Sequence, residues 1–462
     1  MQLLIVTLAE YQTVFWVNVA QALAARGFRP RFLSFDDRSA EMIERAGLPV
    51  VLATDAITRI SVDEQEELFA RAAISGVNSL TTHERLAFNR TDSDAMRAKL
   101  AGAVKAAGRA IEDARAEGGE VVMVQEVGGF LSVIGSYYAA RAAGVDNLFI
   151  EPSFFRGRMM LTKNSFRAPQ IQEAPASPPE EMLDYIRSTL SQGAIVIPEK
   201  DAHQYRSAFK KVVNLKNGRR LVEKAADKYL RGKRQEFGFI GHHVRSHLGM
   251  ILNSRRLRPH YTPLQELQRF IYYPLHVPGD MALTIRSPQF LDQLALVDYL
   301  CRTLPDGYRL ALKEHPAMVG AIGSERMIEL LRRYDNLALL PPTTNNYQVM
   351  ARARAVVTVN SKSGAEAGLL GKRVLVLGDA FYNDAPFALS VRSLTELPEA
   401  LTRELDRSLP DHQAPAHLEW FARVWRESYP GELFVPDIER AEQFADSLAS
   451  ALTAQPPAMQ TA

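Results

Sequence analysis

Hydrophobic and polar positions along the chain follow two periods: short apolar runs that suit strands, and longer stretches with apolar side chains at helical spacing. In the first part of the chain they predict strands over residues 2–8, 31–34, 121–124 and 147–150, and helices over residues 15–25, 94–116 and 131–143. Strands that alternate with helices are typical of a doubly wound parallel sheet. The chain is therefore expected to begin with an α/β domain of this kind.

The same alternation returns after an interruption. A Pro-rich stretch over residues 174–179 and a polar, strongly basic helical section precede it. Strands are then predicted over residues 270–274, 308–313, 337–340, 355–359 and 373–377, and helices over residues 289–304, 324–333, 347–352 and 364–370. Two Rossmann-like halves of comparable size predict the GT-B architecture, in which two parallel-sheet domains face a cleft that binds a nucleotide.

These patterns predict four parts. Residues 1–265 form an N-terminal Rossmann-like domain with a basic helical insertion at about 180–260, and residues 266–430 form the C-terminal Rossmann-like domain. A helix over residues 431–453 is expected to cross back onto the N-terminal domain. Residues 454–462 have no apolar period, so a flexible tail is expected.

Composition sets the class of protein. The 462 residues are 47% hydrophobic and 23% charged, with a formal net charge of +2, which is typical of a soluble globular protein and not of a nucleic-acid polycation. The single Cys301 agrees with a reducing compartment. No apolar run approaches the roughly 20 residues that span a bilayer, so a cytoplasmic location is expected, with any membrane contact peripheral.

Polar side chains follow the strands of the second half. Lys313 and His315 occupy alternate positions at a strand end, so they share one face and suit an anion such as a phosphate. Alternatively, Lys313 is a solvated strand-end residue and His315 a turn residue. The carboxyl ends of parallel strands are where ligands bind in such sheets.

A hydroxyl-rich turn after the strand at 355–359 opens a helix. Ser361, Lys362, Ser363 and Gly364 lie where the free N–H groups of a helix start favour an anion. Simple N-capping explains either hydroxyl equally well. Glu366 in the first turn suits two roles, a partner of the helix dipole or an acceptor for a ribose hydroxyl.

Asp280 lies in a Pro/Gly loop directly after the strand at 270–274. A carboxylate on such a loop is suited to act as a nucleophile or a base. An Asp that ends a turn is the alternative.

Together these residues resemble the bacterial capsule polysaccharide and lipopolysaccharide Kdo transferases, which use the 2-keto acid sugar Kdo activated as CMP-Kdo. The likeness lies in five motifs, Pro274 to Asp280, Leu312 to Pro316, Asn345 to Tyr347, Val359 to Ala367, and Gly371 to Val374. It covers the predicted second domain. The His-Pro element is also found in CMP-sialic acid transferases.

The resemblance implies roles for these residues. Lys313 and His315 contact the CMP phosphate, and Ser361 and Ser363 contact the phosphate or the sugar carboxylate. Asp280 takes the place of the family's proposed nucleophile. The residues that the motifs assign to the donor site are Lys313, His315, Asn345, Tyr347, Ser361, Lys362, Ser363, Gly364 and Glu366.

The acceptor is expected in the N-terminal half, where retaining transfer needs a second group to deprotonate the acceptor hydroxyl. Glu151 is favoured as this acid/base and Glu126 is second, and a structural carboxylate is the alternative for each. The family's Glu-x-Gly stretch and following Asp are replaced by Glu151-Pro152-Ser153, with Thr162 near the position of the Asp. This departure concerns the acceptor half.

The basic section from Lys210 to Arg258 is interpreted either as a solvated helical face or as a dock for an anionic membrane surface, which a lipid-linked acceptor would favour. It lacks the stacking aromatic residues expected for nucleic-acid binding. His242, His243 and His247 have no Cys or carboxylate that completes a metal site, so we expect no metal and no cofactor beyond the CMP-sugar donor.

The sequence therefore predicts a retaining GT-B glycosyltransferase that moves Kdo, or a related 2-keto acid sugar, from CMP to a surface polysaccharide or glycolipid. The alternatives are an inverting CMP-sialic-acid-type transferase, a UDP-sugar 2-epimerase of the same fold, and a catalytically silent GT-B module.

Overall fold

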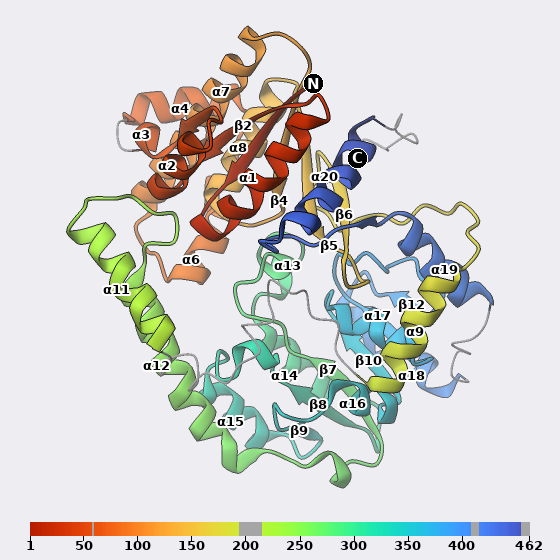
Figure 1. Cartoon of the computed structure of the whole chain (residues 1–462). Helices are drawn as coiled ribbons and strands as arrows, with labels where there is room; N and C mark the ends of the chain where they lie inside the picture. Colours follow the sequence, from red (N-terminus) through yellow and green to blue (C-terminus); the bar gives the residue numbers. More distant parts are fainter. Residues whose placement is uncertain (58–59, 194–214, 408–414, 454–462) are drawn as a thin grey trace.

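The chain folds into two lobes, each built around one β-sheet, in a computed structural model that describes residues 1–57, 60–193, 215–407 and 415–453 (Figure 1). The expected flexible tail at 454–462, and the part of the basic section that includes Lys210 and Lys211, lie outside the described residues.

The first sheet has seven strands in the order β13-β6-β5-β4-β1-β2-β3. Their bounds are β1 Gln2–Thr7, β2 Arg29–Ser34, β3 Val50–Leu52, β4 Val121–Glu126, β5 Asp146–Pro152, β6 Arg158–Lys163 and β13 Tyr429–Pro430. Strands β1 to β5 are parallel, whereas β6 runs antiparallel to β5 and β13 antiparallel to β6. The central parts of β1, β4 and β5 are continuous apolar runs, which suits a parallel sheet with helices on both faces.

Helices of the first lobe lie on both faces of this sheet (Figure 1). They are α1 Glu10–Ala25, α2 Asp37–Arg45, α3 Thr54–Ile57, α4 Val62–Arg71, α5 Val77–Leu80, α6 Thr82–Phe88, α7 Ser93–Ala116 and α8 Leu131–Ala142. The Ala-rich α7 packs closely on α8, where a Cβ at Gly135 would lie 2.6 Å from that of Ala103. Helix α20 (Ile438–Thr453) covers α1, with Phe444 against Trp16 and Arg26 paired with Glu442 at 2.7 Å.

The second sheet is wholly parallel, with six strands in the order β12-β11-β10-β7-β8-β9. Their bounds are β7 Phe270–Pro274, β8 Arg309–Lys313, β9 Leu337–Leu339, β10 Ala355–Thr358, β11 Arg373–Val376 and β12 Ala388–Ser390. The direction in which successive strands are added along the sheet reverses between β7 and β10. Ligands bind outside the carboxyl ends of the strands at such a switch point.

The second lobe also has helices on both faces of its sheet. They are α9 Glu180–Gln192, α13 Met281–Thr284, α14 Gln293–Thr303, α15 Ser324–Arg333, α16 Asn346–Arg352, α17 Lys362–Leu369, α18 Leu397–Asp406 and α19 Pro415–Arg426, with 3-10 turns at Arg258–His260, Leu264–Glu266, Pro288–Phe290, Pro316–Met318 and Leu394–Glu396. Met182 and Ile186 of α9 are buried in this lobe's core, although α9 precedes residue 265 in the chain.

The predicted fold class, α/β with two Rossmann-like parallel sheets, is confirmed. The antiparallel β6 and the short β13 were not predicted. Strand β6 pairs with β5, and β13 pairs with β6 at the sheet edge, and such added strands leave no periodic signal of their own. Helix α1 begins at Glu10, earlier than the predicted start near residue 15. The apolar pattern missed its first turn because Glu10, Gln12 and Thr13 are polar.

Two further helices, α11 (Leu215–Tyr229) and α12 (Ile240–Leu257), connect the lobes along one flank (Figure 1). The segment between them is held to the first lobe by Lys233, whose amino group lies 2.7 Å from Glu41, and by Arg234, which pairs with Asp37 at 3.3 Å. The far end of α12 contacts the second lobe, where Asn253 donates to the carbonyl of Gly320 at 3.0 Å.

Candidate functional site

The carboxyl ends of the strands in the second sheet bring most of the predicted donor residues together. Lys313 ends β8, and its side chain is almost fully buried. Its amino group makes no hydrogen bond or ion pair with any other residue in the described part of the chain. Burial lowers the pKa of Lys313 to about 8, and the nearby Glu366 carboxylate opposes this effect. A buried amine that has no hydrogen bond or ion pair within the protein is suited to bind an anion.

Glu366 lies in the same buried cluster. Its carboxylate accepts a hydrogen bond from the side-chain amide of Asn346 at 3.3 Å, and Asn346 also donates to the Ser363 hydroxyl at 3.2 Å. The Tyr272 hydroxyl donates to Asn346 at 2.7 Å. Asn346 is thus the central residue of the cluster. The sequence motif had instead assigned its two neighbours, Asn345 and Tyr347, to the donor site. The Asn345-Asn346 pair could be recognised as a motif from the sequence, but the sequence does not show which of the two amides faces the site.

The hydroxyl turn starts α17 as expected. The Ser361 hydroxyl caps the helix by accepting from the Ser363 N–H at 3.2 Å. Gly364 is required by packing, since a Cβ there would lie 2.4 Å from the Tyr382 hydroxyl oxygen. Ser363 therefore remains as the hydroxyl beside the Asn346 cluster, while Ser361 and Gly364 shape the turn.

Two predicted donor residues have other partners, and a third is buried. The Lys362 amino group donates to the backbone carbonyls of Pro152 and Ser153 in the first lobe, at 3.2 and 2.9 Å. Asn345 caps α16 through the N–H of Gln348 at 3.1 Å. Tyr347 is buried, which raises the pKa of its hydroxyl, and that hydroxyl has no hydrogen-bond partner among the described residues.

His315 follows β8 and accepts a hydrogen bond from the Ala317 N–H through Nδ1 at 3.3 Å. His276, which follows the neighbouring β7, lies close enough to His315 for the two rings to interact electrostatically. The side-chain amide of Gln293 fixes His276 by bonding to both its backbone N–H and its carbonyl, at 2.7 and 3.1 Å.

His276 has one ring nitrogen without a hydrogen-bond partner among the described residues. Its side chain is buried, and its Nε2 atom makes no hydrogen bond to the residues that the structure covers. Burial lowers the pKa of His276 to about 3, so the ring is neutral at physiological pH. A neutral imidazole close to His315 can donate or accept one hydrogen bond to a ligand. The sequence offered no signal for this role beyond the position of His276 in the Pro274–Asp280 motif.

Asp280 is exposed on the loop after β7, where its carboxylate caps the short α13 by accepting from the Ala282 N–H at 2.9 Å. The same loop contacts the first lobe. The hydroxyl of Thr284 lies 2.9 Å from Nδ1 of the buried His83, and a Cβ at Gly279 would lie 3.5 Å from the backbone nitrogen of Ala87. Asp280 thus lies on a segment that both lobes hold in place.

Glu151, the favoured acid/base, is the penultimate residue of β5 and forms an ion pair between the lobes. Both of its carboxylate oxygens accept from the Arg286 guanidinium, at 2.6 and 3.0 Å. Arg286 also donates to the carbonyl of Phe166 at 2.8 Å. Burial would lower the pKa of Arg286, but the Glu151 carboxylate raises it above the usual value.

Glu126 lies at the end of β4, beside β1, where the strand order of the first sheet reverses. Its carboxylate accepts from the side-chain amide of Gln12 at 3.2 Å. In the second lobe, the predicted donor residues lie at the corresponding place, which is the carboxyl ends of the strands where the strand order reverses. Both candidate carboxylates therefore lie at the carboxyl ends of strands, as expected.

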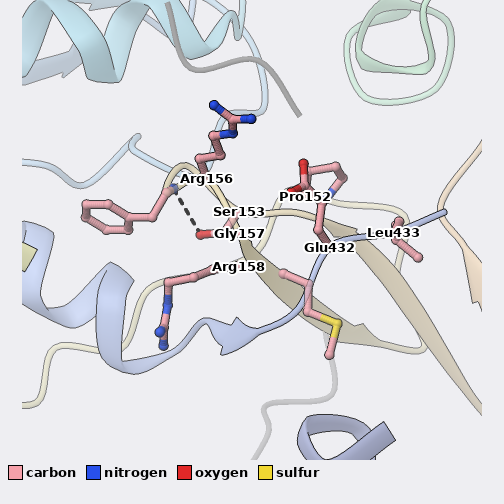
Figure 2. Close-up of a pocket in the computed structure, with 9 residues that line it drawn as sticks. Pro152, Ser153, Arg156, Gly157, Arg158, Glu432 and Leu433 are labelled. Carbon is pink, nitrogen blue, oxygen red and sulfur yellow. Dashed lines mark hydrogen bonds between the residues drawn. The ribbon is translucent and has the colours of Figure 1, made fainter. Parts of the chain in front are cut away.

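The hairpin between β5 and β6, which departs from the family pattern, encloses a small pocket (Figure 2). The pocket is lined by Pro152, Ser153, Phe155, Arg156, Gly157, Arg158, Met159, Glu432 and Leu433. Arg156 and Arg158 point to different sides of the hairpin in Figure 2. The cavity of about 10 Å³ has room for about one water molecule and not for a sugar ring.

Comparison with known proteins addresses the second lobe. Residues 225–388 match the model of a family described as capsule polysaccharide biosynthesis proteins. The expected resemblance to the capsule polysaccharide family is confirmed. The match includes Asp280, Lys313, His315 and the Ser361–Gly364 turn. FixF of Sinorhizobium fredii (strain NBRC 101917 / NGR234) is 29% identical over 164 residues, which are 35% of this chain and 39% of FixF.

The solved structures that match this chain have low sequence identity to it and low TM-scores. KpsC of Thermosulfurimonas dismutans, a β-Kdo 2,7 transferase, has 14% identity and a TM-score of 0.36 over 75% of this chain and 90% of its own. The calicheamicin glycosyltransferase CalG4 has 14% identity and a TM-score of 0.32 over 99% of both chains. MnaA of S. aureus, solved with UDP, has 10% identity and a TM-score of 0.33 over 99% and 100%.

Proposed function

We propose that this protein is a glycosyltransferase that moves Kdo, or a related 2-keto acid sugar, from a CMP-activated donor to a surface polysaccharide or glycolipid. The family match supports assignment to capsule polysaccharide synthesis. The observation that carries the proposal is the buried Lys313 amine, which lies at the carboxyl edge of a parallel sheet and makes no ion pair or hydrogen bond with another described residue, although the Glu366 carboxylate is near. A nucleotide phosphate supplies the missing charge.

Donor binding is divided among the residues of this edge. Lys313 contributes charge, and His315 donates a hydrogen bond to a phosphate oxygen. The Ser363 hydroxyl at the start of α17 binds the phosphate or the sugar carboxylate. Glu366, which Asn346 holds at 3.3 Å, is placed to accept from a ribose hydroxyl.

Transfer with retention takes two displacements. The Asp280 carboxylate attacks the anomeric carbon, and the bond from that carbon to the phosphate oxygen breaks, so CMP leaves with the electron pair. The acceptor hydroxyl then loses its proton to a base, and its oxygen displaces the Asp280 carboxylate. No step in this scheme requires a metal ion.

We assign the base to Glu126 before Glu151, which reverses the order expected from the sequence. Both oxygens of Glu151 are bonded to the Arg286 cation, so this carboxylate is already occupied and would have to release Arg286 before it could accept the proton of an acceptor hydroxyl. One oxygen of Glu126 accepts from the neutral amide of Gln12, at the switch point of the first sheet.

Nucleotide binding tests the donor class. Calorimetry with CMP, UDP and GDP should give the tightest binding for CMP. The His315→Ala variant should weaken CMP binding by about tenfold, which is the loss of one hydrogen bond to a charged group. His260→Ala, on the 3-10 turn after α12, is the control. Preference for UDP would favour the 2-epimerase, and absence of donor hydrolysis under every acceptor condition would favour the silent module.

The proposal includes a cytoplasmic location with peripheral contact to an anionic membrane, where a lipid-linked acceptor is reached. Within the described residues, no helix combines the length and the apolar character needed to cross a bilayer. Basic residues between Lys224 and Arg258 supply charge for such a contact, each worth about 1 kcal/mol near an anionic surface.

A further inference from the structure

Helix α12 carries an apolar stripe on its outer face. Val244, Leu248 and Leu252 follow one another at four-residue spacing, so they lie on one side of the helix. Their exposed fractions are 42%, 52% and 55%. The other side already packs on the second lobe, where Met250 and Leu257 are buried. The stripe is therefore additional to the residues that attach α12 to the protein.

Apolar exposure continues at the end of α11 next to α12. Tyr229 and Leu230 are 71% and 84% exposed, and Val222, two turns earlier, is 68% exposed. Large apolar side chains that gather on neighbouring elements mark an interaction surface, whereas single ones scattered over a surface do not. The two helices thus present one extended flank of the molecule (Figure 1).

Charge on this flank is strongly asymmetric. Residues 221–260 contain nine Lys and Arg residues and three acids, Glu223, Asp227 and Glu236. Asp227 is neutralised by Arg38 and Arg231, and Glu236 is buried against Lys99. The exposed positive charge is carried by Lys224, Lys228, Arg231, Arg245, Arg255, Arg256 and Arg258.

The basic residues do not all serve the same purpose. Lys233 and Arg234 are bonded to carboxylates of the first lobe and fasten the segment to the protein. Arg245 and Arg255 flank the apolar stripe on α12, and neither has an ion pair with another described residue. Guanidinium groups beside exposed Leu and Val side chains match a surface that is apolar inside and anionic at its boundary.

We propose that the stripe of Val244, Leu248 and Leu252 inserts into the interfacial region of an anionic lipid bilayer, with Arg245 and Arg255 bound to lipid headgroups. This inference rests on the proposed function and names the part of the protein that meets the membrane. Because both lobes hold α12, insertion fixes the orientation of the whole enzyme on the surface.

Insertion differs from purely electrostatic docking in its response to salt. The Debye length falls to about 3 Å at 1 M salt, which screens the contribution of exposed Arg and Lys residues. Burial of apolar side chains is not screened. The stripe therefore predicts vesicle binding that weakens with salt but persists at about 1 M, whereas a basic patch alone predicts complete release.

The experiment is sedimentation of the full chain with phosphatidylglycerol vesicles and with phosphatidylcholine vesicles. Leu248→Asp together with Leu252→Asp should weaken binding to the anionic vesicles at least tenfold. The matched control changes two other exposed apolar residues, Val62 and Ile438, to Asp, and should bind as the wild type. Both variants alter exposed side chains, so both are expected to fold.

Equal binding of the two double variants would overturn the inference, as would complete release of the wild-type protein at about 1 M salt. A wild-type dimer in light scattering that the α12 variant dissociates would also overturn it, in favour of a second copy of the chain. CMP calorimetry on the same variants separates this inference from the proposed function, because CMP binding should be unchanged by the α12 substitutions.

Discussion

Glu151 and Arg286 join the two lobes through a two-point ion pair, with the carboxylate in β5 and the guanidinium just after α13. Their side chains are 17% and 9% exposed. Removing one partner of a largely buried pair leaves an uncompensated charge. The pair therefore contributes to the attachment of the lobes, whatever Glu151 does in catalysis.

We expect Glu151→Gln to lower the free energy of unfolding by about 3 kcal/mol, near the lower end for a broken buried pair. The control is Glu180→Gln, which breaks the exposed Glu180–Arg187 pair and should change stability by less than about 0.5 kcal/mol. Urea denaturation measures both. Unchanged stability with lost turnover would instead show that Glu151 is the acid/base.

The second prediction concerns the pH dependence that Lys313 causes. Its pKa is about 8 in the folded protein and about 10.4 in an unfolded chain, so the unfolded state binds more protons between these values. Stability attributable to this residue therefore rises with pH from about 8 to 10.4, by about 3 kcal/mol. The difference between the wild type and Lys313→Met, measured by denaturation at each pH, isolates this effect from other titrating groups.

The same deprotonation affects the donor. Above pH 8 the free protein loses the Lys313 charge, so CMP affinity should fall by up to tenfold per pH unit in the wild type. The Lys313→Met variant should bind more weakly at pH 7 and show no such fall. Parallel curves for the two proteins would contradict a phosphate contact by Lys313.

Asp280→Asn separates the two roles of that residue. Asn caps helices about as well as Asp, so stability should change by less than about 0.5 kcal/mol. Loss of a nucleophile should lower turnover at least about 10³-fold. Asp292→Asn, at the equivalent cap of α14, controls for capping. Turnover that survives Asp280→Asn would favour the inverting alternative.

His276 should affect stability and binding in opposite directions. A buried polar group without a partner costs about 1–3 kcal/mol, so His276→Leu is expected to raise the unfolding midpoint in the absence of ligand. Loss of its hydrogen bond to the donor should weaken CMP binding about fivefold. His276→Gln, which keeps a hydrogen-bonding side chain, should retain affinity better. Unchanged affinity in both variants would show that His276 has no contact with the nucleotide.

Much of the fold could be predicted because it follows from local pattern. Buried parallel strands are continuous apolar runs, so β1, β4, β7, β8 and β10 were recognisable from the sequence alone. Their order then places Lys313, His315 and the Ser361 turn at one edge, since consecutive parallel strands end on the same side. Strand β6, which runs antiparallel next to the sheet edge, carries no such signal and was not predicted.

Contacts between distant residues could not be predicted in the same way. Glu151 and Arg286 are 135 positions apart, and the pattern around neither residue indicates a partner. Lys362 looked like a phosphate ligand because it precedes Ser363, yet its amino group reaches the carbonyl of Ser153 in the other lobe. A motif gives the backbone position of a side chain, while its direction depends on how the lobes pack.

A buried charge cluster in the first lobe gives the last prediction. The Lys99 amino group lies 2.6 Å from Glu84 and 2.7 Å from Glu236, and the Ser132 hydroxyl also donates to Glu236 at 2.7 Å. Glu236 lies just before α12, so this cluster holds the start of the bridging helix against α7. Lys99 accounts for the lowered pKa of Glu84 against the opposing effect of burial, and burial raises the pKa of Glu236.

We expect Lys99→Met to destabilise the protein by about 3–5 kcal/mol, because two carboxylates are left together in a buried site. Lys105→Met, which breaks the surface pair with Glu64, should cost less than about 1 kcal/mol. Adding Glu84→Gln and Glu236→Gln to Lys99→Met should recover part of the loss by removing the repulsion. If the triple variant were no more stable than Lys99→Met, lost packing and not charge would explain the effect, and α12 would be held by its apolar contacts alone.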